Sequence, residues 1–285
     1  MIALRTLAAT GLACLLVTPS SAQLAAKTLP FAKPGHSAWE TVKGGRLRLV
    51  TAPADAHGKA AAAIEIELEP GFKTYWRNPG KDGIPPQVSF FGSRNVATTQ
   101  MNLPPPHVFR EANVTVGYKD SVAFPVAVAV ETPGRPFRLV AQGVLGFCAD
   151  ICVPVPFRLE ASSPEAGGAS ETASTAAPKL FPPTDAFHLK EARYDPAANR
   201  LEVDASVPDT DVLLELVVAQ APGLDLPPAA ATVHQKGESA TFAFELKEDT
   251  VLPDGQELDF TMIVAHLSQP GRIGIEQKVT VARVE

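Results

Sequence analysis

The stretch "PFRLVAQGVLGFCADICVPVPFRLEA", residues 136–161, consists of two runs rich in apolar and β-branched residues on either side of two cysteines. Residues 136–147 lead into Cys148, and residues 153–161 lead away from Cys152. Runs of this length and composition are typical of β-strands, and the three residues between the cysteines are the candidate turn. The sequence therefore predicts a β-hairpin that carries a cysteine pair at its tip.

Short runs of alternating apolar and polar residues extend this pattern to both sides of the hairpin. Residues 44–52 and 62–71 alternate as in strands with one buried and one wet face. Residues 121–131 form a longer apolar run, in which Pro125 indicates a sheet edge or a bulge. Five further runs alternate in the second half, at residues 199–207, 211–220, 239–246, 257–266 and 274–284. Neither half contains a convincing helix of three turns, so the sequence predicts an all-β chain, an immunoglobulin-like β-sandwich followed by a second β-sandwich-like domain.

Residues 161–179 separate the two predicted domains. Sixteen of these 19 residues are Ala, Ser, Gly, Thr or Pro, and they show no apolar periodicity. Because such a segment buries too little apolar surface to offset the entropy of ordering, it predicts a flexible linker. The expected organisation is a first domain over residues 23–160 and a second over residues 180–285.

Residues 1–22 have the pattern of a cleaved secretory signal. Arg5 precedes an apolar run, and small residues end the segment. No later stretch reaches 18 consecutive apolar residues, so the sequence predicts no membrane span. Export implies an oxidising compartment, and cleavage would remove Cys14 and leave Cys148 and Cys152 as the only cysteines.

Charge and motif content exclude several classes of function. The formal net charge of −6 argues against a nucleic-acid partner, which requires a cationic face. No G-x-S-x-G, H-E-x-x-H or phosphate-loop pattern occurs in the sequence. The cysteine pair is therefore the strongest chemical candidate.

From its spacing alone, the cysteine pair allows three interpretations. As a structural disulfide it would close a loop of about five residues, which restricts the unfolded chain by only ~2 kcal/mol, against ~4.7 kcal/mol for a 100-residue loop. A short disulfide is also more prone to strain and to reduction, which favours a redox pair. Two thiolates also suit Cu(I), with His107 and Met101 as candidate further ligands. Spacing leaves a staple and a redox pair equally open.

A second dense stretch, "GFKTYWRNPGKDGIPP" at residues 71–86, combines aromatic residues with glycines and prolines. One interpretation is a turn whose aromatic side chains cap the core. The other is a rigid aromatic surface next to a reactive site.

Four blocks in this order resemble the N-terminal periplasmic domain of the thiol-disulfide reductase DsbD and its relatives involved in copper tolerance. They are residues 71–86, "PPPHVF" at 104–109, "GYKDSVAFPVAV" at 117–128 and "GFCADICVPVPF" at 146–157. Together they cover about residues 40–160. The resemblance implies an immunoglobulin-like sandwich that passes electrons from a membrane-embedded donor to periplasmic thioredoxin-like proteins.

The resemblance also implies roles for individual residues. Cys152 would form a mixed disulfide with the partner, and Cys148 would resolve it. Tyr75 and Tyr118 match positions that flank the pair, and Phe109 is the candidate for an aromatic cap over it. Trp76 and Arg77 complete the expected surround.

The expected activity is that of a thiol-disulfide oxidoreductase whose only redox group is the disulfide, with no other cofactor. Arg77 or Lys119 could supply positive charge to the Cys152 thiolate, while Asp150 would oppose it. Full-length DsbD continues into a membrane domain and a thioredoxin domain that this sequence lacks, so the electron donor is expected to be a separate protein.

Two rival functions remain at this point. The first is a Cu(I)-binding or copper-tolerance protein that uses Cys148, Cys152 and His107. The second is an inert β-sandwich interaction module with a structural disulfide.

Overall fold

The structure, a computed structural model, describes residues 35–165, 180–208, 212–221, 223–266 and 271–284. Residues 32–285 belong to one compact unit of the chain. All regular elements within the described ranges are β-strands, which confirms the predicted all-β fold class. No helix long and apolar enough to cross a membrane occurs in this part of the chain. The predicted signal, residues 1–22, lies outside the described residues.

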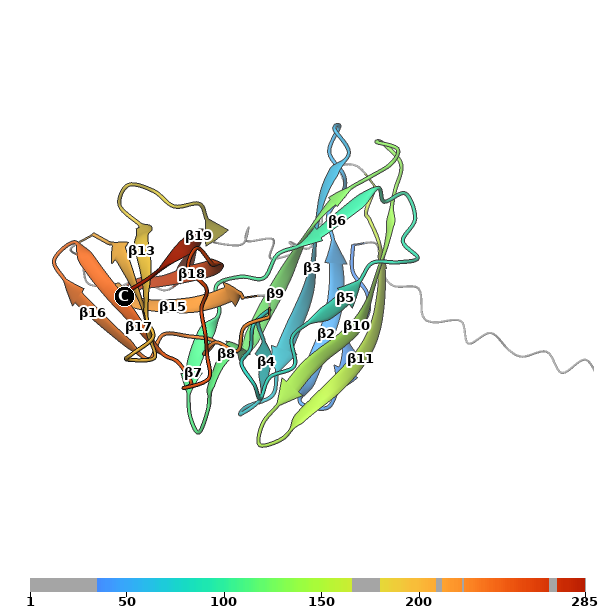
Figure 1. The fold of residues 1–285 in the computed structure, drawn as a ribbon. Coiled ribbons are helices and arrows are strands. Elements are labelled where there is room, and N and C mark those ends of the chain that lie inside the picture. The colour runs from blue at the N-terminus through green and yellow to red at the C-terminus, as the bar shows by residue number, and fades with distance from the viewer. Residues whose placement is uncertain (1–34, 166–179, 209–211, 222, 267–270, 285) are drawn as a thin grey trace, which may run out of the picture. The chain divides into compact units, whose positions relative to one another are not determined.

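The first domain contains eleven strands, drawn from blue to yellow-green in Figure 1. They are β1 (Glu40–Val42), β2 (Gly45–Thr51), β3 (Lys59–Leu68), β4 (Lys73–Tyr75), β5 (Gln87–Ser89), β6 (Thr98–Met101), β7 (His107–Arg110), β8 (Val114–Lys119), β9 (Ser121–Ala129), β10 (Arg138–Cys148) and β11 (Cys152–Ser162). One sheet has the order β1-β2-β3-β9-β6, and the other has the order β11-β10-β4-β8-β7 with β5 paired to β10. The two sheets form the predicted sandwich.

The alternating runs place their apolar side chains between the sheets of the first domain. Leu47 and Leu49 of β2 are fully buried, and Ile64 of β3 is buried among them. Each such side chain contributes about 1.5–3 kcal/mol by leaving water. The intervening Arg48 pairs with Glu65 of β3 at 2.6 Å, so charged residues occupy the outer face of the same strands.

Pro125 lies in an inner strand, where the sequence suggests an edge or a bulge. Strand β9 pairs with β3 on one side and with β6 on the other. The ladder with β6 ends at Met101 opposite Val126, one residue short of Pro125, whose carbonyl accepts a hydrogen bond from the Asn102 amide. Proline therefore occurs at the point where β9 loses a strand neighbour, as expected for a residue without an amide hydrogen.

The hairpin of β10 and β11 is paired without a break from Arg138 opposite Ser162 to Cys148 opposite Cys152. This confirms the predicted position of the cysteine pair at the tip. At its other end, β11 continues two residues into the predicted linker, and the Ser163 amide bonds to the Phe137 carbonyl. Residues 166–179 of that linker lie outside the described residues.

The second domain contains eight strands, drawn from yellow to red in Figure 1. They are β12 (Leu180–Phe181), β13 (His188–Asp195), β14 (Arg200–Ser206), β15 (Val212–Gln220), β16 (Thr232–Lys236), β17 (Ser239–Glu245), β18 (Glu257–His266) and β19 (Arg272–Arg283). Their order is β15-β18-β19-β13-β14-β17-β16, with β12 paired to β19. Phe242, Phe244 and Phe260 are fully buried in the core of this domain.

Candidate redox site at the tip of the β10–β11 hairpin

Cys148 and Cys152 form a disulfide at the end of the hairpin, with their Cα atoms 4.1 Å apart. The two residues face each other in the strand register, and Ala149, Asp150 and Ile151 make the turn between them. The turn is exposed, and Ile151 keeps 77% of its surface accessible.

The two cysteines differ in accessibility. Cys148 is buried, with 2% of its surface exposed, whereas Cys152 is partly exposed. A thiolate attacks a disulfide sulfur along the axis of the S–S bond that it breaks, so the accessibility of each sulfur decides which one reacts first. Cys152 is therefore the more accessible sulfur of the pair, and Cys148 is the one shielded by the protein.

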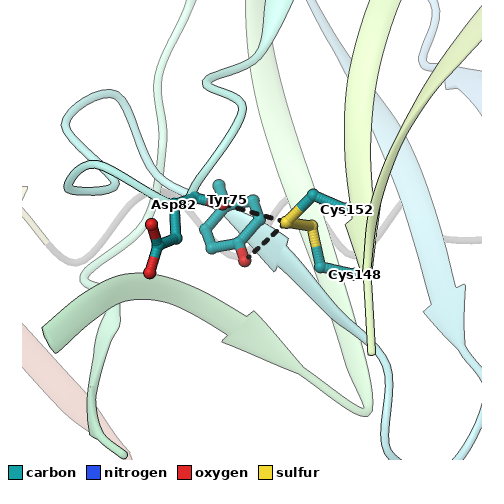
Figure 2. The surroundings of a disulfide bond; sticks show 4 residues. All are labelled: Tyr75, Asp82, Cys148 and Cys152. Atoms are coloured by element: carbon teal, nitrogen blue, oxygen red, sulfur yellow. Dashed lines mark hydrogen bonds between the residues drawn. A yellow bond between two sulfur atoms is a disulfide. The ribbon is translucent and has the colours of Figure 1, made fainter. Parts of the chain in front are cut away.

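Two oxygen atoms lie against the sulfur of Cys152 (Figure 2). The Tyr75 hydroxyl is 3.3 Å from Sγ, and because a disulfide sulfur carries no hydrogen, the hydroxyl is the donor. The Asp82 carbonyl oxygen is 2.9 Å from the same sulfur. This second contact becomes a hydrogen bond only in the reduced protein, where a Cys152 thiol can donate to the carbonyl.

Short strand pairings place Tyr75 beside the disulfide. Strand β4 lies between β10 and β8, with Lys73 opposite Cys148 and Tyr75 opposite Gly117. Glycines also allow close approach on both sides of the Tyr75 ring: a Cβ at Gly83 would lie 2.9 Å from Cδ1, and one at Gly146 would lie 3.1 Å from Cδ2. The tyrosine ring is thus held between Gly83 and Gly146, where the absence of a side chain lets the backbone approach it.

Tyr75 remains a hydrogen-bond donor at neutral pH. Burial raises the pKa of its hydroxyl, and the nearby carboxylates of Asp82 and Glu111 raise it further. The group is 4% exposed and therefore keeps its proton where a Cys152 thiolate would form. A protonated, oriented hydroxyl stabilises a thiolate by donating to it.

The turn between β7 and β8 is bonded to the residues on both sides of the disulfide. Lys73 pairs with Glu111 at 2.5 Å, and its ammonium lies 4.6 Å from the centre of the Phe109 ring. Asn113 donates a hydrogen bond to the Asp82 carboxylate at 2.5 Å. Phe109, the predicted cap, contacts Lys73 and His107, whereas the contacts to Cys152 itself come from Tyr75 and Asp82.

The other predicted surround residues have contacts with groups other than the cysteines. Trp76 is fully buried in the core, under the Arg77 guanidinium at 4.4 Å from its ring centre. Arg77 bonds to Glu276 of β19 and to Thr261 of β18, so its charge is directed to the second domain and not to the cysteines as the sequence suggested. Tyr118 is buried and donates to the Pro104 carbonyl at 2.8 Å, which makes it a core residue.

The metal ligands of the copper alternative are not gathered around the disulfide. His107 stacks on Phe109, and burial together with Arg272 and Lys119 lowers its pKa to about 4. Met101 lies on β6, in the other sheet of the sandwich. Among the residues that the structure describes, no group of three or more His, Cys, Asp or Glu side chains could hold a metal ion.

Asp82, Gly83, Gly146 and Asn113 are parts of the site that sequence reasoning missed. Asp82 contacts Cys152 through its main-chain oxygen, so its residue type carries no signal for that role. The glycines and prolines of residues 79–86 were a visible signal, since they indicate a backbone that approaches another group closely.

The cysteine pair, Tyr75 and Asp82 all lie in the part of the chain that matches a known family. Residues 47–164 match the family model described as "Thiol:disulfide interchange protein DsbD, N-terminal". The match covers most of the first domain and includes both cysteines. The predicted resemblance is thereby confirmed for the first domain. A comparison with curated proteins finds no match.

Solved structures extend the likeness beyond the DsbD N-terminal domain. The N-terminal periplasmic domain of ScsB from Proteus mirabilis superposes with a TM-score of 0.65 at 18% identity, covering 88% of this chain and 100% of that one. At this identity the likeness shows the fold, including that of the second domain. A protein of unknown function from Porphyromonas gingivalis W83 matches with a TM-score of 0.22 at 11% identity, covering 82% of this chain and 95% of that one. This score is too low to show a shared fold.

Proposed function

We propose that this protein is a thiol-disulfide exchange protein that works through Cys148 and Cys152. The observation that carries the proposal is a disulfide at an exposed hairpin tip of a DsbD N-terminal domain, with one sulfur accessible and the other buried. An inert staple has no need for this asymmetry, and a five-residue loop contributes little as a staple.

The exchange reaction follows from the accessibility of the two sulfurs. In the reduced protein, the Cys152 thiolate attacks the disulfide of a partner, and a mixed disulfide forms while one partner sulfur leaves as a thiolate and takes up a proton. The Cys148 thiolate then attacks Sγ of Cys152, which closes the disulfide seen here and releases the partner's second sulfur. Two electrons pass to the partner, and a dithiol donor must return them before the next cycle.

Tyr75 and Asp82 act on opposite forms of Cys152 in this scheme. The Tyr75 hydroxyl donates to the sulfur and therefore favours the thiolate, whereas the Asp82 carbonyl accepts from the thiol and favours the protonated form. A docking partner that displaces the Asp82 contact would leave only the hydrogen bond that activates the sulfur.

We propose that the acceptors are thioredoxin-like proteins of the periplasm and that the donor is a separate, membrane-embedded dithiol protein. The family of the first domain supports an exchange partner in general, and the signal-like residues 1–22 support export. The exposed apolar Ile151 next to Cys152 supports docking on a protein rather than reaction with a small thiol alone.

Trapping of the mixed disulfide tests the function. A Cys148→Ala variant, incubated with an oxidised thioredoxin-like protein, should accumulate a covalent complex through Cys152 that dithiothreitol dissolves. The matched Cys152→Ala variant should trap far less, because Cys148 is buried. Equal trapping by both variants, or trapping by neither, would contradict the proposal.

We further propose that the disulfide is the only redox group of the domain, with no resident metal. Equilibrium dialysis with Cu(I) tests this statement. Sub-nanomolar binding that disappears in a Cys148→Ala, Cys152→Ala double variant would contradict it and favour copper binding.

A further inference from the structure

The chain segment whose two ends contact the sulfur of Cys152 is hydrogen-bonded to the second domain. Tyr75 and Asp82, whose oxygens contact the sulfur, begin and end a short segment, residues 75–82. Within this segment, Arg77 bonds to Glu276 and, at 3.3 Å, to Thr261. Asn78 donates to the Val218 carbonyl of β15 at 2.8 Å. The segment is thus held by the second domain between its two contacts to the disulfide.

The turn between β7 and β8, which bonds to Asp82 through Asn113, is also anchored to the second domain. Arg110 donates to the Ala230 carbonyl at 3.1 Å and pairs with Glu215 at 3.8 Å. Arg272 of β19 pairs with the same Glu215 at 3.6 Å and donates to the Pro106 carbonyl at 3.2 Å. The second domain therefore binds both segments that border the redox site.

Apolar side chains of the second domain also pack against the first domain. The second-domain residues Val217, Ala219, Ala229 and Ile263 are buried in the hydrophobic core that the first domain builds. Gly80 lies so close to both domains that a Cβ there would be 2.8 Å from the Val114 carbonyl oxygen and 3.0 Å from Cγ of Pro228.

The same segment borders an open cavity of about 690 Å³, lined on one side by Arg77, Asn78 and residues 80–82 and on the other by second-domain residues that include Gln220 and Lys247. Two backbone hydrogen bonds hold the segment to β8 of the first domain, from the Trp76 amide to the Val116 carbonyl and from the Val116 amide to the Pro79 carbonyl, each at 3.1 Å. On the cavity side the segment is not covered by packed side chains, and there the polar bonds that cross to the second domain restrain it. Each exposed bond, such as the pair of Arg77 and Glu276, contributes little alone, so several bonds must act together.

We infer that the second domain is a positioning domain for the redox site: its bonds to Arg77 and Asn78 keep the Tyr75 hydroxyl against the sulfur of Cys152. This inference rests on the proposed function, because the position of the Tyr75 hydroxyl matters only if Cys152 takes part in the exchange reaction. Its test uses a small reagent and no protein partner, so that the inference and the proposed function fail separately.

The experiment measures how readily Cys152 reacts with iodoacetamide as a function of pH. A Cys14→Ser, Cys148→Ala background of the full chain leaves Cys152 as the only thiol. Asn78→Ala and Glu276→Gln, singly and together, are introduced into this background, and circular dichroism verifies that each variant is folded. The midpoint of the rate profile reports the pKa of the Cys152 thiol.

Asp82 keeps its hydrogen bond from Asn113 in these variants, so loosening of the segment acts on the Tyr75 hydroxyl. The midpoint should therefore rise in both single variants, and by about one pH unit in the double variant, the size expected when a thiolate loses one hydrogen bond. The direction separates positioning from direct charge effects, because removal of the negative Glu276 would by itself lower the pKa of a nearby thiol. Glu257→Gln is the matched control: it removes the same charge from β18, where Glu257 pairs with Lys278 at 3.5 Å, and should not raise the midpoint.

The contribution of Tyr75 completes the test. In a Tyr75→Phe background, Asn78→Ala and Glu276→Gln should raise the midpoint no further, because the hydroxyl that they position is absent. The inference is overturned if folded single variants leave the midpoint unchanged or lower it, if Glu257→Gln raises it equally, or if the rise is the same without the tyrosine hydroxyl.

Discussion

At the scale of single residues, two oxygens with opposite preferences surround the accessible sulfur. The Tyr75 hydroxyl, at 3.3 Å from Sγ of Cys152, stabilises a thiolate. The Asp82 carbonyl, at 2.9 Å, stabilises a thiol. In the reduced protein these two contacts would therefore shift the pKa of the Cys152 thiol in opposite directions.

Tyr75→Phe removes the donor but keeps the ring between Gly83 and Gly146. We expect the pKa of the Cys152 thiol to rise by about one unit, so that the thiolate fraction and the alkylation rate near neutral pH fall by about 10-fold. Alkylation reactions that are quenched at set times and analysed by mass spectrometry measure this rate. An unchanged rate in the folded variant would show that the hydroxyl does not act on the sulfur.

Tyr118→Phe provides the contrast, because the hydroxyl of this buried tyrosine donates to the Pro104 carbonyl and not to the cysteines. Its loss leaves that carbonyl without the donor, which should lower the free energy of unfolding by about 1–3 kcal/mol. Urea denaturation measures the loss. The alkylation rate of Cys152 should stay as in the parent protein, and a change comparable to that in Tyr75→Phe would contradict this division of roles.

At the scale of elements, the site exists because β10 brings a glycine against β4 and the loop that follows it. A Cβ at Gly146 would lie 2.8 Å from Cβ of Ile84, 2.9 Å from the Ile84 carbonyl oxygen and 3.1 Å from the Tyr75 ring. Two of these three neighbours belong to the loop between β4 and β5, so the loop or the strand must shift to accept a side chain.

Gly146→Ala is therefore expected to lower the free energy of unfolding by about 1–3 kcal/mol, the usual cost of overpacking. Since the shift moves the Tyr75 ring, it should also raise the pKa of Cys152 in the same direction as Tyr75→Phe. Urea denaturation and the alkylation profile measure the two effects. Full stability with an unchanged profile would show that the close approach is not needed.

The longest strands could be predicted from sequence, and the shortest could not. Strands β2, β3, β14 and β17 have seven or more residues and contain a run of alternating apolar and polar side chains. Strands β4 and β5 have three residues, too few for any period, and pair with strands that are distant in sequence, whereas β7 has four residues and pairs with β8 across a short turn. Tyr75 itself and Lys73, which lies opposite Cys148, belong to the short strand β4.

For the candidate site, sequence reasoning named side chains that the structure brings together and missed the contribution of the main chain. Cys148, Cys152 and Tyr75 were named from motif and resemblance, and the structure brings them together. The Asp82 carbonyl carries no residue signature. The direction of Arg77 depends on Glu276, 199 residues further along the chain, which local pattern does not reveal.

At the scale of the whole molecule, charged groups of both domains meet near β7. Burial, Arg272 and Lys119 lower the pKa of His107 to about 4, from an ordinary value of 6.5, so the imidazole is neutral in the folded protein. Burial raises the pKa of Glu215, which Arg110 and Arg272 partly oppose. The two groups therefore respond to acid in opposite senses.

Between pH 6.5 and about 4, the unfolded chain binds a proton at His107 that the folded protein does not. The contribution of His107 to stability is therefore present above pH 6.5 and is lost as the pH falls through this window. Urea denaturation of the parent and of His107→Gln at several pH values isolates it, because Glu215 affects both proteins alike. The stability of the parent should fall more steeply toward acid, and parallel curves would contradict the assignment.

In the proposed function, the reduced Cys148–Cys152 pair passes two electrons to another protein's disulfide. The most direct measurement mixes the reduced full chain with an oxidised thioredoxin-like protein, quenches with acid, labels free thiols and weighs both proteins by mass spectrometry. We expect that one Cys148–Cys152 disulfide appears for each partner disulfide lost, and that Cys152→Ala abolishes the transfer. If both cysteines remain reduced while the partner remains oxidised, over a range of glutathione poises and partners, the claim is contradicted.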